Sequence, residues 1–238
     1  MSNWKARRFW KAAAVVELPG GFGLELDGRP VRTPSKAALV VPTRAMAAAI
    51  AAEWDAQTGE IDPRSMPVTR AANSALDKVI AQRAEVIDLI AEYAGTDLLC
   101  YRATSPEALQ MLQANAWDPL LDWADATFGA RLRVTQGIAP IEQDPEALDR
   151  LKAEVAAMTA FELVALYDLV GITSSLVLGL AVTRGHSEAE AVWAVSRIDD
   201  HWQISQWGED EEAANEASHR HAALIEAAAF WKLARAET

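Results

Sequence analysis

The chain has 238 residues, 51% hydrophobic and 24% charged, and a formal net charge of −12 at pH 7. This composition is that of a globular protein with one large or two unequal domains. Because the negative charge repels a phosphate backbone, we expect no nucleic-acid partner. The single Cys100 excludes an internal disulfide and a pair of cysteine metal ligands, and its apolar, strand-like setting predicts a buried, inert thiol.

Short β-strand signals occupy residues 15–42, where Pro-Gly-Gly, Asp-Gly and Thr-Pro separate alternating or β-branched runs. Asp27-Gly28 suits the positive φ angles of a tight hairpin turn between residues 24–26 and 31–33. The nearby GGFG lacks the lysine, the full glycine spacing and the following helix of a phosphate loop, so we interpret it as a turn. The region predicts a small β-rich N-terminal domain.

From Thr43 onward the apolar residues recur with a helical period. Met46, Ile50 and Trp54 lie four positions apart, so Trp54 is expected on the core face of a helix. Residues 69–95 predict one or two further helices, and the domain boundary is placed among them, near Val79 to Arg83. The expected fold class is α+β, with a β-rich domain over residues 1–80 and a larger, mostly α-helical domain over residues 81–238.

Start and stop signals define separate helices in the second half. Residues 105–107, Ser-Pro-Glu, predict a capped helix start, and Gly129 predicts the end of that helix. Thr159 with Glu162 has capping-box spacing. The longest apolar segment, residues 161–182, is interrupted by Glu162, Asp168 and a Thr-Ser-Ser run, so we expect buried core and no membrane insertion.

The stretch from Ser196 to His221 combines many acids with tryptophans and histidines. Ser187 and Glu190 predict a capped helix that runs on into this stretch. Such a helix would direct one stripe toward the core, which consists of Ala191, Val195, Ile198, Trp202 and Ser205. Trp202 would then anchor the helix to the core, and Gly208 would mark a break or tight corner.

Spacing in this stretch does not favour catalysis or metal binding. His219 and His221 are two positions apart, so they point to different faces of a helix. The consecutive acids at 209–212 are typical of an exposed helix start. We therefore expect no catalytic, cofactor-binding or metal-binding residues. One open alternative is a metal-dependent hydrolase that uses Asp199, Asp200, His201 and Glu209.

Six segments occur in an order that resembles a known protein family. They are RFWK, LDGRPVRTP, AAEWDAQ, TDLLCYR, WDPLLDWA and SRIDDHWQISQWG, and together they span nearly the whole chain. The sequence is similar to the assembly chaperones for the α subunit of F-type ATP synthase. In that family a small β-rich N-terminal domain precedes a helical domain, which agrees with the pattern above.

The resemblance implies a chaperone rather than an enzyme, working without ATP, metal or other cofactor. Its partner would be the unassembled α subunit of the soluble catalytic sector, kept from aggregating until it pairs with the β subunit. A glutamate shortly after the Trp-Gly pair is important in the family and corresponds to Glu211. We expect client contacts from Glu211 and its neighbours Glu209, Asp210 and Glu212.

Further expectations concern location and assembly. Mitochondrial members carry an import segment, whereas RFWK begins here at Arg8, which implies a bacterial, cytoplasmic member. We expect a monomer. A general holdase, which would protect unrelated proteins equally well, is the second open alternative.

Overall fold

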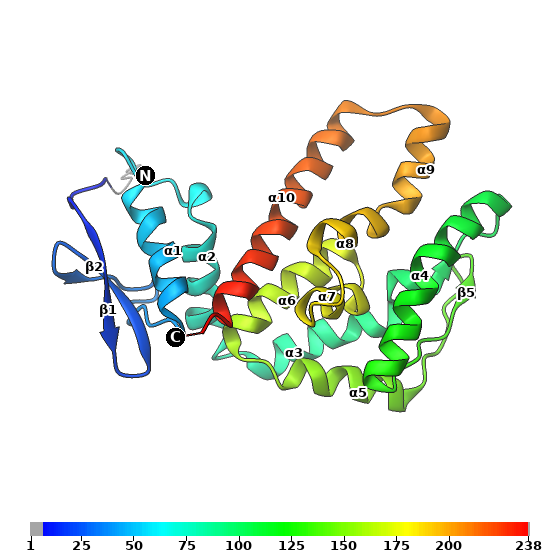
Figure 1. Ribbon diagram of the computed structural model, residues 1–238, viewed down its shortest axis with the longest axis horizontal. Coiled ribbons are helices and arrows are strands. Elements are labelled where there is room, and N and C mark those ends of the chain that lie inside the picture. Colours follow the sequence, from blue (N-terminus) through cyan, green and yellow to red (C-terminus); the bar gives the residue numbers. More distant parts are fainter. Residues whose placement is uncertain (1–6, 238) are drawn as a thin grey trace. The chain divides into compact units, whose positions relative to one another are not determined.

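The computed structural model describes residues 7–237, which divide into two compact units (Figure 1). The first unit comprises the described chain up to Arg83, with Ala160–Ala165 and the C-terminal stretch from Ala229. The second comprises Ala84–Thr159 and Leu166–Ala228. Strands precede a mostly helical chain, which confirms the predicted α+β class. The division into domains 1–80 and 81–238 stays a prediction, and no sequence signal marked the later segments of the first unit.

A three-stranded antiparallel sheet forms the start of the first unit. Strand β1 (Ala13–Leu18) pairs with β2 (Gly21–Leu26), and β2 pairs with the short β3 (Arg29–Pro30). Asp27 and Gly28 have φ angles of 48° and 80°, as a two-residue hairpin turn requires. The predicted turn is therefore confirmed, although the strand after it begins earlier and is shorter than expected.

Helix α1 (Arg44–Asp55) packs against β1 and β2. The hydroxyl of Thr43 accepts a hydrogen bond from the Met46 amide at 3.1 Å and so caps the helix. Met46 and Ile50 are buried, as the apolar period predicts. Trp54 is only half-buried and packs against Trp10, with ring centroids 5.1 Å apart.

Further helical turns complete this part of the chain. They are the 3-10 helix η1 (Pro63–Ser65), α2 (Pro67–Ser74) and the π-helix η2 (Ala75–Val79). No side chain caps α2 at its own N-cap position. Instead, the Glu53 carboxylate of α1 accepts hydrogen bonds from the amides of Val68 and Thr69, at 2.7 and 2.8 Å. The AAEWDAQ segment therefore holds α2 in place.

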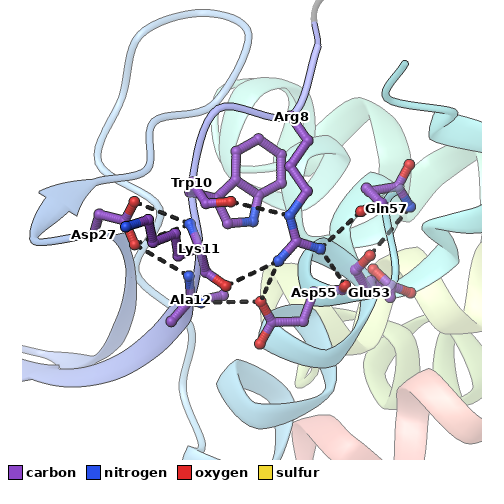
Figure 2. A network of polar contacts seen from close by, with 9 residues as sticks. Arg8, Trp10, Lys11, Ala12, Asp27, Glu53, Asp55 and Gln57 are labelled. Carbon is purple, nitrogen blue, oxygen red and sulfur yellow. Dashed lines mark hydrogen bonds and ion pairs between the residues drawn. The ribbon is translucent and has the colours of Figure 1, made fainter. Parts of the chain in front are cut away.

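Arg8 fastens the segment before β1 to the end of α1 (Figure 2). Its guanidinium donates to the carbonyl oxygens of Trp10, Lys11 and Gln57 at 3.0, 3.0 and 2.7 Å, and also to that of Asp55. A cation suits this position because the last carbonyls of a helix lack partners within the helix. The RFWK segment thus serves the fold.

Asp27 holds the same segment from the other side (Figure 2). Its carboxylate accepts hydrogen bonds from the Lys11 amide at 3.0 Å and the Ala12 amide at 3.1 Å. These hydrogen bonds lower the pKa of the Asp27 carboxyl. One residue therefore supplies both the hairpin turn and an anchor for the chain that enters the sheet.

The rest of the chain is mostly helical. Its elements in chain order are α3 (Arg83–Glu92), η3 (Tyr93–Thr96), η4 (Leu98–Cys100), β4 (Tyr101–Arg102), α4 (Glu107–Phe128), β5 (Thr135–Gln136), α5 (Pro145–Ala156), α6 (Ala160–Thr173), α7 (Leu176–Thr183), α8 (Ala189–Ser196), α9 (Ile198–Trp207) and α10 (Glu211–Ala234). The short strands β4 and β5 pair in parallel.

The apolar segment 161–182 forms α6 and α7, separated by a break at Ser174, where φ is 57°. Every residue of α7 is buried, which confirms the predicted core. Gly179 allows the close approach of the two helices, because a β-carbon there would lie 2.6 Å from Val170 Cγ2. Among residues 7–237, no helix is both long and apolar enough to span a bilayer.

Asp97 joins η4 to the start of α7. It is completely buried, and its carboxylate accepts hydrogen bonds from the amides of Leu99 at 3.0 Å and Val177 at 3.1 Å. Burial raises the pKa of Asp97 to about 6, against the opposing effect of hydrogen bonds from Ser175, Val177 and Leu99. Through Asp97, the TDLLCYR segment thus connects η4 to the start of α7 inside the protein.

Several sequence predictions need correction. Cys100 lies in the 3-10 helix η4 rather than a strand, and burial raises the pKa of its thiol to about 12, so the thiol stays protonated. Ser105 does not cap α4, because Pro106 itself takes the extended N-cap conformation. Ser187 likewise does not cap α8, whose N-cap is Glu188. Gly129, in the left-handed conformation, ends α4 as predicted.

The helix expected to run on from Ser187 is two helices. α8 ends at Ser196 and α9 begins at Ile198, with Arg197 between them at φ −109° and ψ 16°. The predicted stripe is therefore divided between two helices, with Ala191 and Val195 on α8 and Ile198, Trp202 and Ser205 on α9.

The buried Asp97 carboxyl predicts an unusual pH dependence of stability. Because the folded-state pKa of about 6 lies above the ordinary value of 3.8, Asp97 contributes stability that is fully present below pH 3.8 and lost as pH rises through 6. Relative to Asp97→Asn, which does not titrate, the unfolding free energy of the wild type should fall by up to about 3 kcal/mol over this window. Urea unfolding of both proteins from pH 4 to 7 measures it; a constant difference would contradict the raised pKa.

Candidate functional site

Helix α9 is unusual because none of its residues is buried. Trp207 is 80% exposed and Ile204 is 38% exposed, while Trp202 is half-buried. Residues 211–220, the first part of α10, also contain no buried residue. Residues 208–210 join α9 to α10, and this connection lies at one end of both helices (Figure 1). Trp202 is therefore not the buried core anchor that the sequence predicted: it shares a hollow with residues of α4 and stays half-buried.

Two side chains of α4 hold α8 and α9 in place. The buried Gln113 donates through Nε2 to Asp199 Oδ1 at 2.6 Å. The buried Trp117 donates through Nε1 to the carbonyl oxygen of Val195 at 2.9 Å. Burial raises the pKa of the Asp199 carboxyl, the Gln113 hydrogen bond lowers it, and the charge of Asp200 raises it further. These contacts fix the start of α9 against α4.

A hollow of about 650 Å³ lies between α4 and the α8–α9 pair, and we call it the α4–α9 hollow. Its lining residues come from these three helices: Leu112, Asn115, Ala116, Ala194, Val195, Ile198, His201, Trp202 and Ser205. Most of these side chains are apolar. Four members of the predicted core stripe therefore line an open hollow instead of packing against the protein interior.

A second hollow, of about 620 Å³, lies on the α10 side of α9, and we call it the α9–α10 hollow. It is more polar than the first, and its lining includes Trp193, Arg197, Asp200, Trp207 and His221. Arg197 pairs with Asp200 at 2.9 Å and lies over the Trp193 ring, 5.2 Å from its centroid. This lining combines aromatic surface with charged groups.

The four acids predicted to bind a client lie at the corner between α9 and α10. Glu209, Asp210, Glu211 and Glu212 are all exposed. Asp210 Oδ1 accepts a hydrogen bond from the Ala213 amide at 2.8 Å, so Asp210 caps α10. Glu209 and Asp210 line the α9–α10 hollow, whereas Glu211 and Glu212 lie outside its lining. Their client contacts stay a prediction.

The residues of the metal-site alternative do not converge. Asp199 bonds to Gln113 of α4, and Asp200 pairs with Arg197, so the adjacent carboxylates have different partners. Over residues 7–237, no group of three or more histidine, cysteine, aspartate and glutamate side chains is arranged to hold a metal ion. The described chain therefore offers the proposed hydrolase no ligand set.

Sequence reasoning missed several residues of this surface. Gln113 contacts Asp199 across 86 positions of sequence, and nothing local to either residue indicates the pair. Trp193 and Arg197 were not singled out, although an aromatic residue and an arginine four positions apart are neighbours on a helix. One sequence feature could have indicated that Trp207 is exposed: it directly precedes Gly208, where a corner was predicted.

Comparisons with known proteins agree on one family. The family model described as ATP12 chaperone protein matches residues 7–125. A Schizosaccharomyces pombe protein named mitochondrial atp12 is 26% identical over 221 residues, covering 87% of this chain and 75% of that protein. The crystal structure of Atp12 from Paracoccus denitrificans is 50% identical, covers 97% of this chain and 99% of that chain, and has a TM-score of 0.95. A mutant of the Paracoccus protein matches with a TM-score of 0.96.

The contact between Gln113 and Asp199 predicts a local effect. Gln113→Leu should leave the Asp199 carboxylate and the Ala103 amide without their buried partner, lowering the unfolding free energy by about 1 to 3 kcal/mol. Amide hydrogen exchange in α9 should accelerate before the rest of the chain opens. Gln110→Leu is the matched control, because Gln110 bonds to the Ala103 carbonyl of the same loop. Equal exchange rates in α9 for both variants would mean that Gln113 does not hold α9.

Proposed function

Because this chain belongs to the ATP12 chaperone family, we propose that it binds the unassembled α subunit of F-type ATP synthase. Binding would keep the α subunit from aggregating until it pairs with the β subunit. An unpaired subunit exposes apolar surface that its partner would cover, and such surface aggregates. The proposed task requires reversible covering of that surface and no chemical step.

The observation that carries this proposal is the unburied helix α9. The five other segments that support the family resemblance serve the fold. Arg8 fastens RFWK, and Asp27 of LDGRPVRTP binds the chain before β1. Glu53 holds α2, Asp97 joins η4 to α7, and Trp117 is buried beneath α8. The SRIDDHWQISQWG segment instead forms a helix without a buried residue. Its exposed apolar and aromatic side chains suit contact with another protein.

The acids at the α9–α10 corner suit contact with basic residues of the α subunit. Glu209, Asp210, Glu211 and Glu212 place four carboxylates beside the exposed Trp207. Such a group attracts basic residues of a partner and speeds their encounter. We propose that Glu211 contacts the α subunit directly, while Asp210 also holds the start of α10.

Oligomeric state, cofactor use and location also belong to the proposed function. We propose a monomer that acts without a cofactor in the cytoplasm of a bacterium, as the similarity to the Paracoccus protein suggests. A general holdase is the second candidate, because exposed aromatic surface at Trp207 could contact many unfolded chains. Light scattering of an aggregating α subunit and of an unrelated aggregating protein separates the two. Equal protection of both would favour the holdase.

We predict that Glu211→Gln weakens capture of the α subunit without changing thermal unfolding. An exposed carboxylate contributes little to stability, whereas loss of a charge-assisted contact at an interface is worth about 2 kcal/mol. Glu216→Gln is the matched control, because Glu216 is also exposed on α10. Affinity capture and thermal melting measure both effects. Equal weakening by the two variants, or by neither, would show that Glu211 makes no specific contact.

A further inference from the structure

We infer that the α4–α9 hollow receives a basic amphipathic segment of the α subunit, whose apolar side chains enter the hollow. The inference rests on the proposed function. It identifies the surface of the chaperone that binds the α subunit and the chemistry of the segment that this surface recognises. Its basic side chains would lie toward the acids of α9 and of the α9–α10 corner.

The lining of the α4–α9 hollow is mostly apolar, like the side chains of a protein core. Only Asn115, His201 and Ser205 bring polar side chains to it. Ile198 and Trp202 are half-buried, although the sequence places them on an apolar stripe typical of a core-facing helix. This apolar surface stays in water in the isolated chain, so covering it by an apolar segment is favourable.

The hollow is held open before any partner arrives. Gln113 and Trp117 fix the junction of α8 and α9 to α4 at 2.6 and 2.9 Å. A surface whose shape is already set loses less conformational entropy on binding than one that must form. A volume of about 650 Å³ accommodates a few side chains of a short segment rather than a folded domain.

Carboxylates on α9 and at the α9–α10 corner favour a basic occupant, although none of them lines the α4–α9 hollow itself. Residues 196–221 contain seven aspartates and glutamates but two arginines. Both arginines are engaged, Arg197 with Asp200 at 2.9 Å and Arg220 with the Ile172 carbonyl at 2.6 Å. The excess of carboxylates attracts lysine and arginine. A second copy of this chain, with net charge −12, would bring the same acidic surface and be repelled.

Filling the hollow tests the inference. Ala194 is exposed on α8 and lines the hollow, so Ala194→Phe should occupy the space that a client side chain needs. Ala191 is also exposed on α8 but lies outside both hollows, so Ala191→Phe is the matched control. Binding of purified α subunit should weaken about tenfold for Ala194→Phe, equivalent to one buried apolar contact, and less than about twofold for the control. Both variants should melt like the wild type.

A second pair of variants removes apolar surface instead of adding it. Leu112 and Met111 are neighbours on α4, 49% and 55% exposed, and only Leu112 lines the hollow. Leu112→Asn should weaken α-subunit binding severalfold, whereas Met111→Asn should not. If all four variants bind the α subunit as the wild type does, the hollow is not the binding surface and the inference is wrong.

Peptides identify the occupant. Overlapping peptides of the α subunit are tested for binding to the wild type and to Ala194→Phe. Peptides bound only by the wild type should carry apolar residues three and four positions apart together with lysine or arginine, and should bind more weakly as salt rises from about 0.05 to about 0.5 M. Selection of acidic peptides, or a wild-type dimer that Ala194→Phe dissociates, would overturn the inference. Failure of the wild type to bind intact α subunit would instead overturn the proposed function.

Discussion

The position of α9 depends on two hydrogen bonds from α4. Gln113 reaches Asp199 at 2.6 Å, and Trp117 reaches the Val195 carbonyl at 2.9 Å, both from buried positions. These bonds hold the junction of α8 and α9 by polar atoms, so that α9 is located although none of its side chains is fully buried. A helix positioned only by apolar packing would have covered the stripe that includes Ile198 and Trp202. Because hydrogen bonds attach the α8–α9 junction to α4, the α4–α9 hollow stays open, and α9 keeps surface that a client can contact.

The family-like segments divide into those that stabilise the fold and one that remains exposed. Arg8, Glu53 and Asp97 each bind backbone groups of a distant segment, so they fix where strands and helices meet. Buried backbone groups need such partners, and charged side chains supply strong ones. The SRIDDHWQISQWG segment contributes Asp199 to the contact with Gln113, but none of its residues is buried, and Trp207 is 80% exposed. A chaperone requires both properties, because a rigid body must present surface that the fold itself does not use.

Local chemistry determined which features could be predicted from sequence. Asp27-Gly28 specifies its turn because few residues accept two successive positive φ angles, and Met46 and Ile50 identify the buried face of α1. The break at Arg197 lacks a glycine or proline signal, and the sequence placed Trp202 in the core because its spacing does not reveal whether another helix covers it. The sequence correctly placed the acids at 209–212 at a helix start. It could not show that only Glu209 and Asp210 line the α9–α10 hollow, because that depends on tertiary structure.

Amide hydrogen exchange of this chain alone and in complex with the α subunit tests the central claim, that the surface around α9 is the client-binding surface. The account predicts slower exchange on binding in α9, in the start of α10 and around Leu112 of α4, with the β1–β2 hairpin unchanged. Slower exchange confined to the sheet of β1, β2 and β3, with α9 unaffected, would contradict it.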